Sequence, residues 1–341
     1  MNSTNISNIN NICPICFKQI SESIAPYNDI GWTDFGIFDN LQVMHCISCG
    51  FGFSMPELNK KVVDYFYEKQ YRAKDSTFHI DFSKLKYYDG IRDIRNSRPF
   101  GQLSLARAFC KFNSQDIFLD VGPGLGGSFK VAKVLFENPK LYAIELSQGA
   151  SEFYRNSYNV LCHPSIDDFI SSEKKAQIIL MSHSLEHYRL SDLPKLFSNL
   201  ALALDKNGVV VAEVPNVDLR LHCENRGADT PHFLFFSKES LALIFEKYSF
   251  EVLFIDTCGP DYPSVEEFLI SHSNSSKIKS HLKQTFNNQP KFFQIVLRTI
   301  LRAFRKTKNF KLTGKLKARK TLPNQSYGGN RNCIRIVVRK K

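Results

Sequence analysis

A glycine-rich turn between an apolar strand and a helix constrains the fold of this chain more than any other feature. Residues 117–121, IFLDV, have the pattern of a buried strand, and GPGLGG follows at residues 122–127. Residues 128–136 then have the pattern of a helix. Glycines at such a turn allow the backbone to approach a ligand closely, and the amides that begin the helix face that ligand. The pattern therefore predicts a nucleotide-type site at one edge of a parallel sheet.

Strand and helix patterns alternate from about residue 100 onward. Further strand patterns occupy residues 141–144, 178–181, 209–214, 250–256 and 333–338. Such alternation is typical of a parallel sheet with helices packed on its faces. We therefore expect an α/β domain.

Acidic side chains stand at the ends of the first two of these strands. Asp120 lies two residues before Gly122, where dehydrogenases usually have an apolar residue. Glu145 follows the second strand, 19 residues beyond Gly126. An acid at that place can accept hydrogen bonds from both hydroxyls of a ribose. The string SHSLEH follows the next strand at residues 182–187. These features favour a ribose-containing cofactor other than the dinucleotide of a dehydrogenase.

In this order and spacing, the DxGxGxG string, the strand-end acid and the LEH string resemble those of the class I S-adenosylmethionine-dependent methyltransferases. The resemblance covers residues 100–258 and returns at residues 333–338. It implies an enzyme with S-adenosylmethionine as cofactor and an α/β, Rossmann-like seven-stranded methyltransferase sheet whose last strand is antiparallel. Carried onto this sequence, the family's cofactor contacts place the amino-acid end on Asp120, Gly122, Gly124 and Gly126, the ribose on Glu145, and the adenine amino group on Asp167.

Two CxxC pairs near the amino terminus predict a metal site. Cys13 and Cys16 form the first pair, and Cys46 and Cys49 form the second after an interval of 29 residues. Two such turns can surround one ion with four thiolates in a tetrahedron, which suits Zn²⁺. Four protein ligands leave no open position, so we expect a structural zinc. A module this small hardly buries a core without a metal.

The domain organisation follows from these patterns. We expect a small zinc-binding, zinc-ribbon-like domain at residues 1–56 and a helical connector rich in aromatic residues at 57–100. A methyltransferase domain should occupy residues 101–341, with a basic helical insertion at about 259–330.

Positive charge is concentrated at the carboxyl-terminal end. The chain has a net charge of +12, and residues 277–341 hold 19 Lys and Arg but no Asp or Glu. Residues 292–305 have the pattern of a basic amphipathic helix, which suits docking onto an anionic membrane. A helix packed on the domain with its basic face in water fits the same pattern. Because the sequence shows neither a secretion signal nor a membrane-spanning stretch, we expect a cytoplasmic protein, peripheral to the inner face of the membrane.

Candidate general bases stand at strand ends, where parallel sheets bind ligands. His183, Glu186 and His187 follow the fourth strand, and His232 opens the string HFLFFS. That string resembles the zinc-ribbon-bearing sugar methyltransferases, some of which methylate carbon beside a ketone. In those enzymes a Glu usually precedes the His, whereas here Pro231 does. A hydroxyl needs less help than a carbon acid, so we expect O-methylation with His232 as base. Structural roles for all four side chains, including packing of His183 beside the adenine, fit the same pattern.

The sequence therefore favours an enzyme that O-methylates a sugar or glycan, free or lipid-linked, in cell-envelope or secondary-metabolite biosynthesis. Three alternatives stay open. An RNA methyltransferase fits the basic tail and the zinc module. Nucleic acid is nevertheless the less favoured partner, because the chain lacks the Asn/Asp-Pro-Pro-aromatic string used for base amines. The others are a sugar C-methyltransferase and a non-catalytic zinc-ribbon interaction protein, which would not bind the cofactor.

Overall fold

The computed structural model describes most of the chain outside the basic insertion. The described residues are 12–26, 37–38, 41–71, 80–83, 85, 94, 97–217, 232–258 and 333–341, with backbone alone for 21–26. The basic insertion expected at 259–330 and Pro231 lie outside this part. Among the described residues, no helix combines the length and the apolar character needed to cross a bilayer.

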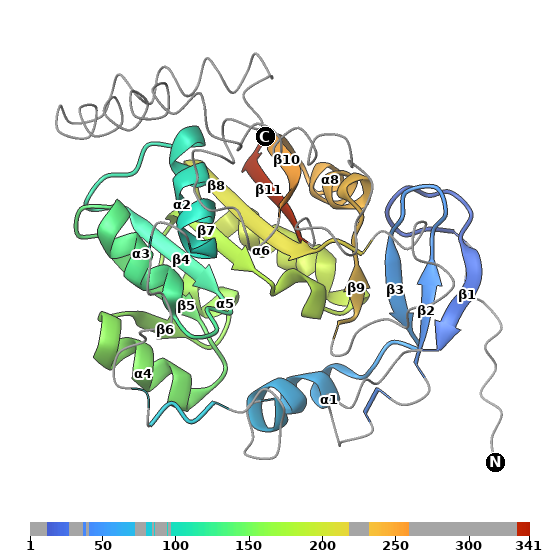
Figure 1. Cartoon of the computed structure of the whole chain (residues 1–341), viewed down its shortest axis with the longest axis horizontal. Coiled ribbons are helices and arrows are strands. Elements are labelled where there is room, and N and C mark those ends of the chain that lie inside the picture. Colours follow the sequence, from blue (N-terminus) through green and yellow to red (C-terminus); the bar gives the residue numbers. More distant parts are fainter. Residues whose placement is uncertain are drawn as a thin grey trace, which may run out of the picture.

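A seven-stranded sheet forms the centre of the molecule, in the order β10-β11-β8-β7-β4-β5-β6 (Figure 1). The strands are β4 (Ile117–Val121), β5 (Lys140–Ile144), β6 (Leu161–His163), β7 (Ala176–Ser182), β8 (Leu204–Pro215), β10 (Phe250–Cys258) and β11 (Cys333–Lys340). β11 runs antiparallel to both of its neighbours, while the pairs from β8 to β6 are parallel. This confirms the predicted Rossmann-like sheet with an antiparallel last strand.

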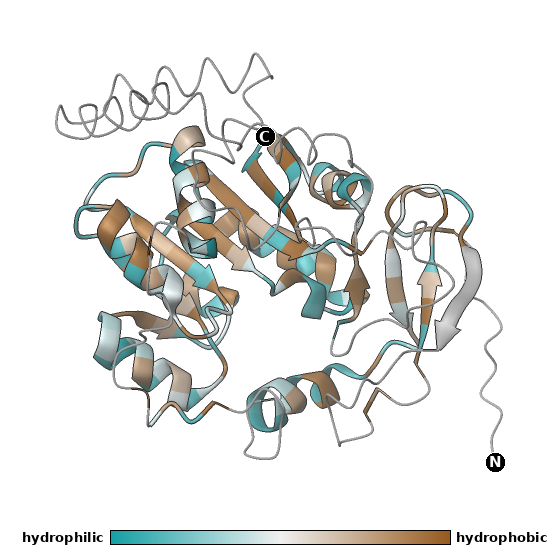
Figure 2. Ribbon diagram, in the orientation of Figure 1, coloured by the Kyte–Doolittle hydropathy of each residue, from teal (hydrophilic) through white to brown (hydrophobic). Residues whose placement is uncertain are grey.

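Helices cover both faces of this sheet because its strands are apolar on both sides, as their brown colour in Figure 2 shows. The helices are α2 (Arg98–Phe109), α3 (Gly127–Leu135), α4 (Gln148–Tyr158), α5 (Ile166–Ser171), α6 (Leu193–Ala203) and α8 (Lys238–Lys247). In β4, Leu119 packs in one apolar cluster with α5, α6 and α8, and its neighbour Phe118 packs in a second cluster with α2, α3 and α4. Alternate residues of one strand thus anchor the two helical layers.

The amino-terminal module contains a second, smaller sheet, in the order β1-β2-β3-β9. Its first three strands are β1 (Ser21–Pro26), β2 (Gln42–His45) and β3 (Gly52–Met55). The fourth, β9 (Leu234–Phe235), comes from the sequence that precedes α8 and pairs antiparallel with β3. One apolar cluster includes Phe51 and Phe53 of the module and Leu119 of the central sheet. The module and the central sheet therefore share a core.

The first part of the connector expected at residues 57–100 is helical. α1 (Lys60–Tyr65) continues into a π-helical turn, η1 (Phe66–Gln70), and α2 already begins at Arg98. Residues 72–79 and most of 84–96 lie outside the described part. The domain boundaries at residues 56 and 100 stay predictions.

Ser237 caps α8 and also joins it to the module. Its hydroxyl accepts a hydrogen bond from the amide of Ser240 at 3.0 Å and donates to the carbonyl of Cys49 at 2.5 Å. We expect Ser237→Ala to lower the free energy of unfolding by about 1–2 kcal/mol, measured by urea denaturation. Ser165→Ala removes the cap of α5 and a hydrogen bond to the side chain of Asp168 in the same helix, but no contact with the module, and should cost less. Equal losses would show that the contact with Cys49 adds nothing.

Candidate functional site

Glycine backbone geometry shapes the turn after β4. Gly122, Gly124 and Gly126 have φ angles of 74°, 61° and 73°, in the left-handed region that other residues adopt only at a cost. The amide of Gly126 donates to the carbonyl of Pro123 at 2.9 Å, and α3 begins directly afterwards. Among the described residues, a Cβ added to Gly124 would meet no atom within 4 Å. The turn therefore presents bare backbone and the first amides of α3 to a ligand.

Asp120 lies beneath this turn and is only 2% exposed. The hydroxyl of Ser128, in the first turn of α3, donates to its Oδ2. In the described part of the chain, Oδ1 has no hydrogen-bond partner. Burial raises the pKa of Asp120 to about 7, although the bond from Ser128 acts in the opposite direction. A buried carboxylate with an unused oxygen is suited to a cationic group of a ligand.

Glu145 follows β5, the strand beside β4 in the sheet. Its Oε1 accepts a hydrogen bond from the amide of Ser147 at 2.9 Å. The hydroxyl of Tyr154 lies 3.4 Å from Oε2 and donates to the carbonyl of Gly124. Tyr154 thus links Glu145 to the glycine turn, and the structure brings Asp120, the turn and Glu145 to one edge of the sheet.

Asp167 has a different environment on α5. Its carboxylate forms an ion pair with Lys195 of α6 at 2.9 Å, and both side chains are about half exposed or more. The hydrogen bond with Lys195 lowers the pKa of Asp167. The structure therefore connects Asp167 to α6, and its contact with adenine stays a prediction.

A buried ionic group lies at the carboxyl ends of β7 and β8. Glu213 of β8 accepts a hydrogen bond from Nε of Arg335 on β11 at 2.6 Å, and Nε of Arg98 lies 3.2 Å from its Oε1. Nε2 of His183 lies 3.5 Å from the same Oε1. Burial acts to raise the pKa of Glu213, but Arg335 and His183 outweigh it and hold the carboxyl ionised. The group fixes three strands and α2 to one another.

His183 belongs to this ionic group. Its Nδ1 lies 3.2 Å from Oε1 of Glu186. Burial acts to lower the pKa of His183, but contacts with Cys333, Glu186 and Glu213 raise it well above its usual value. A protonated imidazole has no lone pair with which to accept a proton. This position joins His183 to the two buried glutamates, and its role as a general base stays a prediction.

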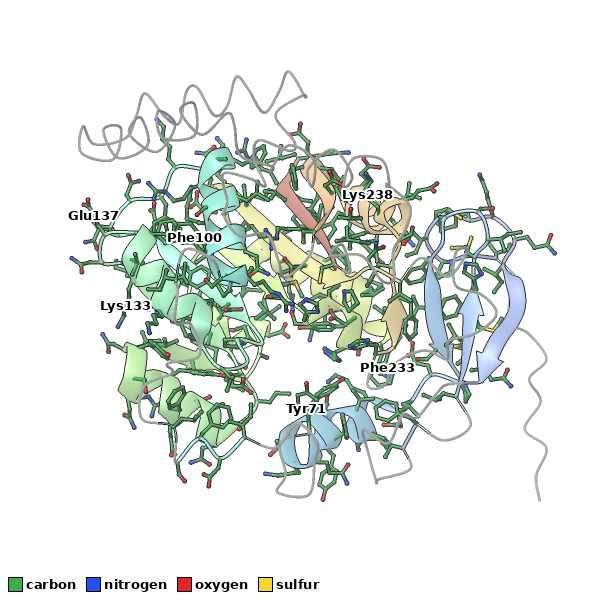
Figure 3. All side chains as sticks on the ribbon, viewed as in Figure 1. Tyr71, Phe100, Lys133, Glu137, Phe233 and Lys238 are labelled. Carbon is green, nitrogen blue, oxygen red and sulfur yellow. The ribbon has the colours of Figure 1, made fainter. Side chains whose placement is uncertain are left out.

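A second polar group contains Glu186, His187 and His232. One oxygen of Glu186 and one ring nitrogen of each histidine lie within 4.8 Å of one another. The hydroxyl of Tyr67 forms a 2.8 Å hydrogen bond with Nδ1 of His187. Tyr71 and Phe233 are labelled in Figure 3. The ring centroid of Tyr71 lies 6.3 Å from that of His187, and the amide of Phe233 donates to the carbonyl of Glu186 at 2.8 Å. We refer to Glu186, His187 and His232 as the His–Glu cluster.

Charge in the His–Glu cluster is distributed unevenly. Burial acts to raise the pKa of Glu186, but the neighbouring histidines, His183 first, lower it to about 2. Burial, together with His187, lowers the pKa of His232 to about 3. A neutral imidazole beside a carboxylate can bind a metal ion, whereas a lowered pKa weakens it as an acceptor of the proton of a hydroxyl.

Sequence reasoning missed Glu213, Arg335 and Tyr67. The first two are single charges inside the apolar strand patterns 209–214 and 333–338, and a charge there requires a buried partner. That signal could have found them. Tyr67 is one of many aromatic residues in the connector, and nothing in the sequence distinguishes it.

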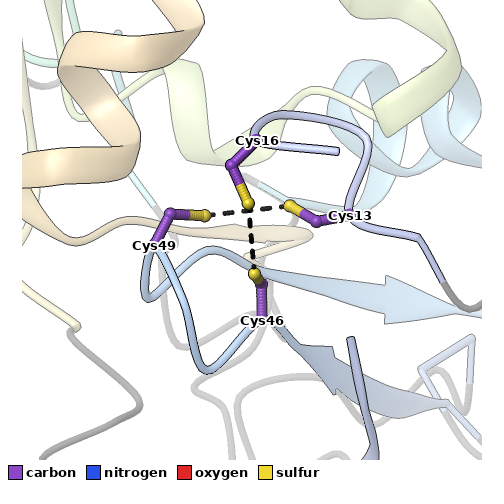
Figure 4. Close-up of side chains that lie close together, drawn as sticks. All are labelled: Cys13, Cys16, Cys46 and Cys49. Atoms are coloured by element: carbon purple, nitrogen blue, oxygen red, sulfur yellow. Dashed lines mark hydrogen bonds between the residues drawn. The ribbon is translucent and has the colours of Figure 1, made fainter. Parts of the chain in front are cut away.

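The four cysteines of the CxxC pairs come together in the amino-terminal module (Figure 4). The Sγ atoms of Cys13 and Cys49 are 3.7 Å apart, and those of Cys16 and Cys46 are 3.5 Å apart. Sulfurs at the corners of a tetrahedron around zinc lie about 3.8 Å apart, since Zn–S bonds are about 2.3 Å long. Hydrogen bonding with Cys49 lowers the pKa of the Cys13 thiol, which favours the thiolate form that zinc binds. The residues fit a tetrathiolate zinc site.

Comparison with known proteins gives a domain match and similar solved structures. A family model described as a methyltransferase domain matches residues 95–254, and none of the curated proteins matches the chain. A methyltransferase from Geobacter sulfurreducens, solved with S-adenosyl-L-homocysteine, is 14% identical, with 73% of this chain and 94% of that chain covered and a TM-score of 0.39. One from Archaeoglobus fulgidus is 17% identical, with 74% and 97% covered and a TM-score of 0.39. A cyclopropane synthase from Mycobacterium tuberculosis is 13% identical, with 71% and 84% covered and a TM-score of 0.42. TM-scores at this level do not support an argument. The assignment of a methyltransferase domain therefore rests on the family model.

Proposed function

The chain carries a class I S-adenosylmethionine-dependent methyltransferase domain, and from this premise we propose that it methylates a hydroxyl group of a sugar. One observation carries the proposal. The His–Glu cluster, with a carboxylate only 1% exposed, lies at the carboxyl edge of the sheet beside the glycine turn. A Cβ on Gly122 would come within 3.3 Å of the Cβ of Ser184, two residues before Glu186. An acceptor held at the cluster would therefore lie beside the cofactor.

We propose that the cofactor binds along the tips of β4 and β5. Asp120 and the turn of Gly122, Gly124 and Gly126 would hold its amino-acid end, and Glu145 its ribose. The unused Oδ1 of Asp120 and the fixed carboxylate of Glu145 support this arrangement. Asp167 would take the adenine amino group. S-adenosylmethionine supplies the methyl group, and the chain aligns the hydroxyl with it.

Cofactor affinity should depend on pH through Asp120. Below its pKa of about 7 the carboxyl is protonated, and it must lose that proton to pair with the ammonium group of the cofactor. Binding then releases a proton, so affinity rises with pH up to this value and levels off above it. We expect S-adenosylhomocysteine to bind about tenfold more weakly at pH 6 than at pH 7.5. Calorimetry in two buffers of different ionisation enthalpy measures both effects, and a constant affinity without proton release would contradict this role.

We propose that Cys13, Cys16, Cys46 and Cys49 bind one structural Zn²⁺. Their spacing and the thiolate character of the site support this assignment. With four protein ligands, the ion would stabilise the module and take no part in methyl transfer.

The acceptor class is tested with labelled S-adenosylmethionine. Nucleotide sugars, lipid-linked sugars and RNA are offered in parallel, and label in an O-methyl group of a sugar, identified by NMR, supports the proposal. Label on a sugar carbon would replace O-methylation with C-methylation. Transfer to RNA alone, lost steeply as salt is raised, would replace the sugar with a nucleic acid. No transfer and no cofactor binding would leave a non-catalytic interaction protein.

Lipid-linked sugars belong in this panel because of the basic carboxyl-terminal sequence. Residues 277–341 hold 19 Lys and Arg without any acid. We propose that this sequence brings a cytoplasmic enzyme to the anionic inner face of the membrane. Faster methylation of a lipid-linked than of a soluble sugar, only on anionic vesicles, is the expected result.

A further inference from the structure

We propose that the His–Glu cluster, made of Glu186, His187 and His232, binds a divalent transition-metal ion. The three ligand atoms lie within 4.8 Å of one another at the carboxyl edge of the central sheet. Ligand atoms around such an ion lie about 3–4 Å apart, since metal–nitrogen bonds are about 2.1 Å long. Small rotations of these side chains therefore suffice to close the site.

The carboxylate of Glu186 can take a cationic partner in addition to His183. Its side chain is 1% exposed, and neither carboxylate oxygen has a hydrogen-bond partner among the described residues. The nearest charge, Nδ1 of His183, lies 3.2 Å from Oε1. Glu213, equally buried, accepts a hydrogen bond from Arg335 at 2.6 Å. His183 lies beside Oε1, so Oε2 is the oxygen available to a metal ion, and the two adjacent histidines supply further ligand atoms.

The surrounding structure holds the two histidines in place. The hydroxyl of Tyr67 forms a hydrogen bond with Nδ1 of His187, in the manner of a hydrogen bond to the non-ligating nitrogen of a metal-binding histidine. His232 immediately precedes Phe233, whose amide donates to the carbonyl of Glu186 at 2.8 Å. This bond ties two ligands from separate parts of the sequence to each other.

The ligand set indicates the kind of ion. Two imidazoles and one carboxylate suit first-row divalent ions from Mn²⁺ to Zn²⁺ and disfavour the soft thiolate-seeking ions. Three protein ligands also leave positions open for a substrate oxygen. The cysteine cluster, by contrast, supplies four sulfurs and leaves none.

The role of this ion in methyl transfer rests on the proposed function, whereas its binding to the cluster does not. The acceptor hydroxyl would occupy an open position, where the ion lowers its pKa. Its O–H bond breaks with the proton passing to solvent. The oxygen then bonds to the methyl carbon as the C–S bond of the cofactor breaks, and S-adenosylhomocysteine leaves. In this arrangement His232 acts as a ligand, in place of the general base that the sequence suggested.

The test is binding of Mn²⁺, without any acceptor, to protein that holds a single zinc ion per chain at its cysteines. Binding is monitored as loss of the EPR signal of Mn²⁺ in solution. We expect one ion per chain. Glu186→Gln keeps the shape of the side chain but removes its charge, and should weaken binding at least tenfold, as should His232→Asn. His163→Gln, which changes a histidine on β6 outside the cluster, should bind like the wild type. Binding of S-adenosylhomocysteine checks that each variant is folded. If Glu186→Gln is not folded, the Mn²⁺ affinity of His232→Asn decides the test.

Wild-type protein that binds no Mn²⁺, or variants that bind it as tightly as wild type, would overturn the metal site. The outcome is separable from that of the proposed function. Stoichiometric Mn²⁺ binding without methylation of any sugar would retain the site and remove the sugar. Methylation of a sugar by protein that binds no Mn²⁺ would retain the proposed function and remove the metal site.

Discussion

Glu145→Ala is expected to weaken binding of S-adenosylhomocysteine by at least about 100-fold. In the proposed arrangement its carboxylate accepts hydrogen bonds from both ribose hydroxyls. Hydrogen bonds to a charged group contribute about 1.5–3 kcal/mol each, so their joint loss corresponds to about 100-fold or more. The amide of Ser147 already fixes Oε1 at 2.9 Å, so little side-chain entropy is lost when ligand binds. Calorimetric titration measures the affinity directly.

A matched control separates this effect from general damage. Glu152→Ala removes an exposed carboxylate from the adjoining helix α4, where it accepts a hydrogen bond from Gln148, and should leave affinity within about twofold. Asp120→Asn, which keeps the bulk of the buried side chain, should also weaken binding strongly and should remove its pH dependence. Unchanged affinity in Glu145→Ala would remove β5 from the cofactor site.

The central sheet could be predicted because the residues that favour each strand and turn locally are also the residues that the folded sheet buries or bends. Residues 117–121 are buried without exception in β4, and the apolar run at 117–119 with Val121 predicted a central strand. The glycines at 122, 124 and 126 stand where the φ angle is positive, so the turn type was also encoded locally. Strand β11 was predicted only through the resemblance to a family, since nothing local sets its direction.

The join between the two sheets could not be predicted. β9 has only two residues, Leu234 and Phe235, and an apolar pair this short carries no periodicity. Its pairing with β3 depends on contacts between residues about 180 positions apart, such as Phe53 with Leu234. The same holds for the His–Glu cluster. The sequence indicated its members one by one, but their proximity follows from the bond between the Phe233 amide and the Glu186 carbonyl.

Cys46→Ser is expected to remove the zinc and, with it, methyl transfer, while cofactor binding survives. Structural zinc contributes about 10 kcal/mol or more to modules of this size, and three ligands hold it at least about 100-fold more weakly than four. Metal analysis should show about one zinc per chain fewer than in wild type. Cys110→Ser, which changes a buried cysteine at the end of α2, should keep its zinc.

The expected loss of activity follows from how the module holds the segment that carries His232. The amide of Ser54 donates to the carbonyl of Phe233 at 2.9 Å, and Gly52 of β3 pairs with Phe235 of β9. Ser237 completes the attachment through the carbonyl of Cys49, one of the proposed zinc ligands. An unfolded module releases His232 from the cluster, whereas Asp120 and Glu145 stay on β4 and β5. Binding of S-adenosylhomocysteine should therefore stay within about threefold of wild type while methylation falls at least about 100-fold. Loss of both together would show that the module supports the whole catalytic domain, and retention of both would show that the active site does not depend on it.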